Sequence, residues 1–406
     1  AALAGGDTGV AIGWFDRAMA GMTDPSGVAE LRLKKIEACY AANDFRSLES
    51  ELECLNVEHL ERPLAALAEY WRHKIGMASA VDAGVRSSAM RGMRSVVAEF
   101  KALEMPYWEA LALSKVAIVG HYHDQNPGLP LAKEAVRVAG EDAGALAVAW
   151  DAVAMVHVYD GALNKSMKAS QSAVEAAKTA GLLGMELALL GDLAWSAGQL
   201  GRFEEAEAAL VEVISRSARI GNQLASAYAL HNLGLVYLNL GKLDEALVTE
   251  ERALDMAITG DNDRLKAYCQ VYRAFILLAH ERSTDAAESA RTAFAFARGT
   301  ELEAAARTAL AHALFEQQQY DIALEEADHA FRLREESGRM VEFAVELTLA
   351  RAKILLALGR EDEAALIITG SCAELEVRAA KLTTNADEFR QFMAIPAHER
   401  LISLRI

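Results

Sequence analysis

Apolar and polar positions alternate with a helical period along nearly the whole chain. Residues 230–254 read LHNLGLVYLNLGKLDEALVTEERAL, in which an apolar stripe at helical spacing precedes a Gly-Lys turn and a second stripe follows it. Alternations of β-branched residues are few, and only 6 prolines interrupt 406 residues. The pattern predicts an all-α chain of amphipathic helices that are joined by tight turns.

The helical pattern repeats at a fixed interval of 40 residues. Two series of glycines mark the turns, and Gly260 falls one residue short of the second: Gly161, Gly201 and Gly241; Gly181 and Gly221. Alanines recur where two helices of one unit must approach closely: Ala206, Ala246, Ala286 and Ala323. Because one helix pair cannot bury its apolar face alone, we expect successive pairs to stack into a solenoid.

The best-formed unit resembles a known repeat. It matches the signature positions of the tetratricopeptide repeat at Leu233-Gly234, Tyr237, Gly241, Leu243, Ala246 and Ala253-Leu254. The length near 40 residues is similar to the repeats of peptide-pheromone receptors, signalling ATPases of the maltose-activator type and kinase-linked repeat proteins of bacteria. The resemblance implies a right-handed superhelical solenoid of antiparallel helix pairs.

The strength of the repeat varies along the chain and suggests three regions. Residues 1–112 are expected to form divergent helical repeats, residues 113–375 the solenoid core, and residues 376–406 capping helices that cover its last apolar face. Residues 5–19 fit the second half of a unit. We therefore expect the chain to start within a repeat, with an effector domain upstream.

Charge and cysteine content narrow the possible partners and location. The net charge of −17 makes a nucleic acid a poor partner, whereas a basic protein or peptide would be attracted. No apolar run is long enough to cross a bilayer, so no membrane contact is expected. The four scattered cysteines suit a reducing compartment, and we expect a cytoplasmic protein.

No motif for catalysis, a cofactor or a metal stands out in the sequence. His121 and His123 lie beside Asp124, but residues two apart on a helix point to different sides and cannot readily share an ion. The sequence also lacks a phosphate-binding loop and a nucleophile elbow. We expect neither enzymatic activity nor a cofactor.

The resemblance implies that the first helices of successive units line a concave groove. Applied to this chain, the geometry of the family gives a set of candidate ligand-binding residues: Asp151, Tyr159, Asp192, Trp195, Gln199, Tyr228, His231, Asn232, Asn239, Tyr268, Tyr272 and His312. In pheromone receptors an Asn at the place of Asn232 binds the peptide backbone, which a side-chain amide suits because it both donates and accepts.

Three of these polar residues stand among apolar neighbours. A buried polar side chain without a partner is costly, so His231, Asn232 and Asn239 are expected to face solvent or a ligand. The sequence thus predicts a protein- or peptide-binding sensor of a larger bacterial signalling protein. Two alternatives stay open: a sensor of a small, sugar-like molecule, and a scaffold for self-association into a homo-oligomer.

Overall fold

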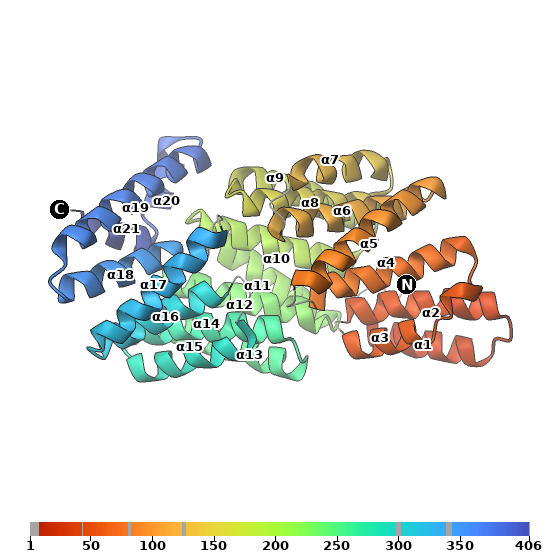
Figure 1. Ribbon diagram of the computed structural model, residues 1–406, viewed down its shortest axis with the longest axis horizontal. Coiled ribbons are helices and arrows are strands. Elements are labelled where there is room, and N and C mark those ends of the chain that lie inside the picture. The colour runs from red at the N-terminus through yellow and green to blue at the C-terminus, as the bar shows by residue number, and fades with distance from the viewer. Residues whose placement is uncertain are drawn as a thin grey trace. The chain divides into compact units, whose positions relative to one another are not determined.

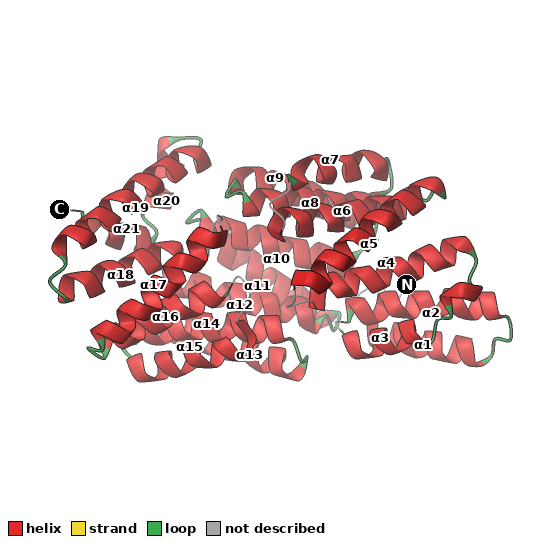
Figure 2. Ribbon diagram, viewed as in Figure 1, coloured by secondary structure: helices red, strands yellow, loops and turns green. Residues whose placement is uncertain are grey.

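The computed structural model describes residues 8–42, 44–79, 83–123, 127–297, 302–337 and 343–405. Within these ranges the only regular secondary structure is helical, as Figure 2 shows, and this confirms the all-α prediction. None of the helices in the described part of the chain is long and apolar enough to cross a membrane.

The helices follow one another with short connections (Figure 1). The first are α1 (Thr8–Ala20), α2 (Pro25–Ala41), α3 (Phe45–Glu53), the 3₁₀ turn η1 (Val57–His59), α4 (Arg62–Ser79), α5 (Ala83–Ala102), α6 (Pro106–His123) and α7 (Gly128–Ala139). Next come α8 (Ala143–Tyr159), α9 (Leu163–Thr179), α10 (Leu183–Gln199), α11 (Phe203–Arg219), α12 (Gln223–Asn239), α13 (Leu243–Thr259) and α14 (Asp263–Ala279). The last are α15 (Ser283–Ala297), α16 (Glu303–Glu316), α17 (Tyr320–Ser337), α18 (Ala344–Ala357), α19 (Glu361–Leu382), α20 (Ala386–Met393) and α21 (Pro396–Ser403).

The predicted interval of 40 residues is most regular from α8 to α14. Each of these helices spans 17 residues and begins 20 residues after the one before it. Two helices and their turns therefore make up one unit of 40 residues, as the glycine spacing indicated.

The turns show why glycine recurs at this spacing. Gly201 and Gly241 have φ angles of 79° and 72°, in the left-handed region that residues with a Cβ atom seldom adopt. The prediction for Gly260 was wrong in detail, because its φ is −85° and Asp261 takes the left-handed conformation with a φ of 48°. The position in the repeat is thus kept at residue 261 even though the residue type changes.

The recurring alanines lie at the interfaces between helices. Ala206, Ala246, Ala286 and Ala323 are all fully buried. Consecutive helices such as α14 and α15 or α16 and α17 pack against each other, and α16 also contacts α18. Small side chains at these positions let the helix backbones approach closely, so that the pairs stack as an all-α solenoid of the tetratricopeptide type.

The chain divides into two compact units. The first comprises residues 1–158, 165–190 and 216–224, and the second comprises residues 159–164, 191–215 and 225–406. The buried core of the first unit contains large aromatic side chains, among them Tyr70, Trp71 and Phe100. The main core of the second unit is rich in alanine along α14 to α18.

Candidate functional site

A cleft in the second unit brings together side chains from both its early and its late helices. It lies between α10, the start of α11, α12 and the C-terminal helices α18, α19 and α21. Its lining, which we call the α10–α12 cleft, comprises Trp195, Gly198, Gln199, Phe203, Asn232, Leu235, Val236, Asn239, Phe343, Ala344, Val345, Glu346, Arg378, Ile395, Ala397 and His398.

Helical spacing places the amide side chains of the cleft. On α10, Trp195 and Gln199 are four residues apart, and on α12, Asn232 and Asn239 are seven apart, so each pair shares a helix face. All four side chains are half-buried. Asn239 Nδ2 donates a hydrogen bond to the carbonyl of Leu235 at 2.9 Å, which fixes that amide within the wall of the cleft.

The opposite side of the cleft comes from residues that the sequence analysis did not include. Phe343 and Glu346 stand at the start of α18, Arg378 on α19 and His398 on α21. Burial lowers the pKa of His398 to about 4, so the imidazole is neutral near pH 7, and its Nδ1 donates to the Phe392 carbonyl at 2.8 Å. Burial also lowers the pKa of Arg378, and the nearby Glu346 carboxylate opposes that change.

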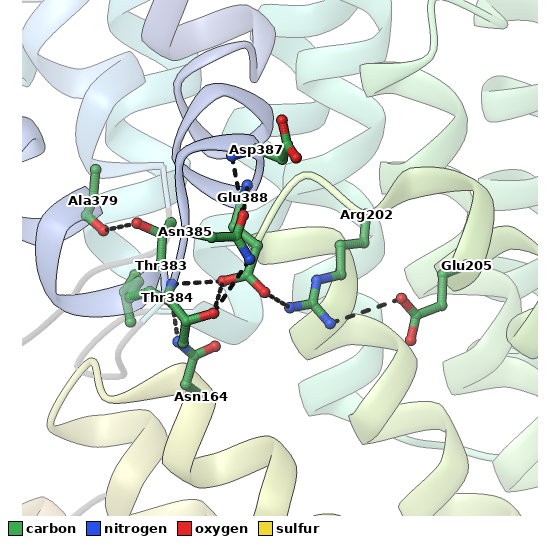
Figure 3. Close-up of polar contacts among 10 residues, drawn as sticks. Asn164, Arg202, Glu205, Ala379, Thr383, Thr384, Asn385, Asp387 and Glu388 are labelled. Carbon is green, nitrogen blue, oxygen red and sulfur yellow. Dashed lines mark hydrogen bonds and ion pairs between the residues drawn. The ribbon is translucent and has the colours of Figure 1, made fainter.

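Polar contacts join the C-terminal segment to earlier helices of the same unit (Figure 3). Arg202 forms an ion pair with Glu388 at 3.4 Å, and Glu388 Oε2 accepts hydrogen bonds from the backbone and hydroxyl of Thr384. Asn164 Nδ2 donates to the Leu382 carbonyl. These contacts span about half the chain in sequence and bring α20 and α21 to the turn that precedes α11.

Gly201 is needed at this contact for a second reason besides its backbone conformation. A Cβ atom at residue 201 would lie 2.7 Å from the Gln391 carbonyl oxygen and 3.3 Å from Ile395. The backbone of α20 and the chain after it therefore approach the turn as closely as glycine permits. No repeat signature signals this requirement, since it arises from residues almost 200 positions later.

The structure brings four of the twelve predicted groove residues into one cleft: Trp195, Gln199, Asn232 and Asn239. The expectation that His231 faces solvent or a ligand was wrong, because its side chain is only 3% exposed and is paired with Glu250. Tyr272 is also buried and stacks on His231, with ring centroids 4.0 Å apart, instead of facing Asn232 across a groove. A partner in the next helix thus satisfies His231 within the core.

The remaining predicted residues lie outside the cleft lining. Asp192 is exposed, and the side chains of Tyr159, Tyr228 and Tyr268 are half-buried. Half-buried His312 donates from Nε2 to the Glu346 carbonyl at 2.8 Å, and burial lowers its pKa to about 4.

Two acidic or metal-like candidates belong to the first unit. Asp151 on α8 has a pKa raised to about 6 by burial, which Lys115 partly offsets. His121 Nδ1 accepts a hydrogen bond from the Gly128 backbone at 3.2 Å and so secures the start of α7. Asp124, the acidic neighbour of the two histidines in sequence, lies outside the described residues.

The geometry of the α10–α12 cleft suits recognition by hydrogen bonds and stacking. Three side-chain amides offer donors and acceptors, and Trp195 offers an aromatic face. One guanidinium and one carboxylate, Arg378 and Glu346, stand on the other side. The arrangement defines the chain as a helical-repeat protein with a polar and aromatic cleft.

Comparison with protein families identifies the repeat. Residues 184–259 and 308–370 match the tetratricopeptide repeat. The chain is a tetratricopeptide repeat protein. No curated protein sequence matches it.

Solved structures share the fold at low sequence identity. The chain is similar to a Rap protein complexed with competence and sporulation factor, at 11% identity and a TM-score of 0.58 over 84% of this chain and 95% of that chain. It is similar to aspartyl phosphate phosphatase F from Bacillus subtilis, at 14% identity and a TM-score of 0.54 over 82% and 93%. The Rap conjugation gene regulator of plasmid pLS20, in complex with the Phr* peptide, gives 11% identity and a TM-score of 0.52 over 98% and 97%.

Proposed function

We propose that the chain is a regulatory interaction module that binds an extended peptide or protein segment in the α10–α12 cleft. The observation that carries the proposal is the convergence of Gln199, Asn232 and Asn239 with Trp195 in one half-buried cleft. An extended backbone presents alternating donors and acceptors, which side-chain amides can pair without a charge. The aromatic face of Trp195 would anchor one side chain of the segment.

The solved structures of similar fold support this proposal. Two of them are described as complexes, one with competence and sporulation factor and one with the Phr* peptide. The likeness to a phosphatase is one of fold, and we continue to expect no catalytic role for this chain. The net charge of −17 favours a basic ligand through long-range attraction, although the cleft itself contains both Arg378 and Glu346.

The proposal can be tested with a displayed library of random peptides that is selected on the purified chain. A selected peptide is then synthesised and titrated by calorimetry against the chain and its variants. Asn232→Ala and Trp195→Ala should each weaken binding by roughly 1–3 kcal/mol, because each removes a partner that the bound peptide shields from water. Melting curves of both variants establish that they remain folded.

Matched controls come from the first unit. Asn56 is exposed and makes no side-chain capping bond, and Trp14 is 60% exposed, so Asn56→Ala and Trp14→Ala should leave peptide binding unchanged. Equal binding by all four variants would contradict the proposal. Saturable binding of an oligosaccharide, sensitive to Trp195→Ala, would instead support the alternative of a small-molecule sensor.

A further inference from the structure

A buried cluster of metal-ligand side chains lies in the second unit beside the cleft. His231 on α12, Glu250 on α13 and Cys269 on α14 each place one ligand atom so that all three atoms lie within 4.8 Å of one another. His231 Nδ1 is 2.8 Å from Glu250 Oε1 and 4.0 Å from Cys269 Sγ. All three residues are buried, Glu250 and Cys269 completely.

Glu250 provides an independent sign that something is missing from the cluster. One carboxylate oxygen, Oε1, pairs with His231, but Oε2 has no hydrogen-bond partner among the described residues. A fully buried carboxylate with an unsatisfied oxygen is costly. Space is nevertheless kept for it, since a Cβ atom at Gly234 would lie 2.5 Å from Oε2. The fold thus accommodates a buried acid that the packing alone does not satisfy.

We propose that His231, Glu250 and Cys269 bind a divalent transition-metal ion of the zinc type. The donor set of one nitrogen, one oxygen and one sulfur is the borderline-soft set that Zn²⁺ prefers. Neutral imidazole, carboxylate and thiolate together carry two negative charges, so a divalent ion makes the buried site electrically neutral. Three protein ligands leave the fourth tetrahedral position for water or another donor.

The separations fit such an ion after small side-chain rotations. Ligand bonds of about 2.0–2.3 Å in a tetrahedron place the donor atoms roughly 3.3–3.7 Å apart. The Nδ1–Oε1 hydrogen bond at 2.8 Å must therefore open slightly, while Sγ at 4.0 Å from Nδ1 must move inward. The ion replaces the proton that the histidine and the carboxylate share, and it gives Oε2 a cationic neighbour.

The ion would join two consecutive units of the repeat. α12 and α13 belong to one helix pair, and α14 begins the next. Residues 231, 250 and 269 are 19 apart, close to the helix-to-helix interval of 20, so they occupy equivalent levels on three successive helices. Bound metal would fix α12, which also carries Asn232 and Asn239. The site goes beyond peptide binding, and its test needs no peptide.

The test is a titration of the chelator-treated full chain with Co²⁺, a spectroscopic substitute for Zn²⁺. We expect one Co²⁺ per chain, a near-ultraviolet band from thiolate-to-metal charge transfer and the visible bands of tetrahedral coordination, all displaced by Zn²⁺. Cys269→Ser should abolish the thiolate band and weaken binding by roughly 100-fold or more. Cys372→Ser is the matched control, because Cys372 is a buried free thiol outside the cluster and its loss should leave the band intact.

Two further variants and a melting experiment complete the test. His231→Gln and Glu250→Gln should also weaken Co²⁺ binding, and Zn²⁺ should raise the melting temperature of the unaltered chain but not of Cys269→Ser. If a variant does not fold, the spectrum of the unaltered chain still decides. Absence of the thiolate band at one equivalent of Co²⁺, or its persistence in Cys269→Ser, would overturn the proposal and leave a protonated Glu250 with a trapped water as the explanation.

Discussion

The two units of the chain fill their cores in different ways. In the first unit Tyr70 contacts Trp71 and Trp108 with ring centroids 5.3 and 5.5 Å apart, and Phe100 is fully buried beside them. In the second unit the main core consists mostly of alanines on α14 to α18, and helix backbones approach closely instead. The first core relies on the volume of its side chains, whereas the second relies on their smallness.

This difference follows the clarity of the repeat in the sequence. The signature of the tetratricopeptide repeat is weak before residue 113, where large aromatics pack irregularly, and strong where alanines recur at fixed positions. A repeat whose helices meet through alanine must reproduce the same spacing in every unit. A core of aromatics can adapt its packing locally, so that the sequence there has fewer fixed positions.

Truncation in the first core should have the largest effect on stability. Phe100→Ala removes a fully buried ring and leaves a cavity among Tyr70 and Trp108, which should cost about 3–5 kcal/mol of unfolding free energy. Urea unfolding followed by circular dichroism measures the loss. Phe45→Ala, at a half-buried ring of the same unit, is the control and should cost less. An equal loss for both would show that the aromatic cluster has no special weight.

Enlargement should be what harms the second unit. Ala246 on α13 is fully buried, and Ala246→Leu should overpack the helix pair and cost roughly 1–3 kcal/mol. Thermal melting is the measurement, and Val248→Leu at a 58% exposed position of the same helix is the matched control. An unchanged melting temperature for Ala246→Leu would mean that the close approach of α12 and α13 does not depend on alanine.

The second unit should also lose stability in mild acid. Burial, with added repulsion from charged neighbours, lowers the folded-state pKa of His312 and His398 to about 4, below the 6.5 of an exposed histidine. The unfolded chain therefore binds more protons between these values, and stability is lost as the pH falls from about 6.5 towards 4. We expect a decrease of about 1–3 kcal/mol between pH 6.5 and 5.

Variants assign this pH dependence to the histidines. His312→Gln keeps a donor for the Glu346 carbonyl but cannot titrate, so its stability should depend less on pH in this window. His59→Gln, at an exposed residue of the first unit, should retain the full dependence. A slope that is the same in all three proteins would contradict the assignment to buried histidines.

The sequence predicted the helices and their interval but only part of the site. Helical periodicity and turn glycines act locally, so both could be read directly, and even the exception at Gly260 and Asp261 lies within one residue. The partners of His231 could not be read in this way, because Glu250 and Cys269 are 19 and 38 residues further on. Spacing near half a repeat is the signal that would have found them. Arg378 and His398 reach the cleft through the fold of the C-terminal helices, which no repeat pattern specifies.

Two neighbouring residues on α12 give the smallest and sharpest test. Asn232 is half-buried in the cleft, and its side chain borders space that a ligand would fill, so Asn232→Ala should change the unfolding free energy by no more than about 0.5 kcal/mol. His231→Ala, one residue earlier, removes the partner of the fully buried Glu250 and should cost about 1–3 kcal/mol. Urea unfolding of both variants in the presence of a chelator measures the difference without bound metal. A large loss for Asn232→Ala would make that amide part of the core, whereas a small one leaves its conformation free to serve a ligand, as a cleft residue must.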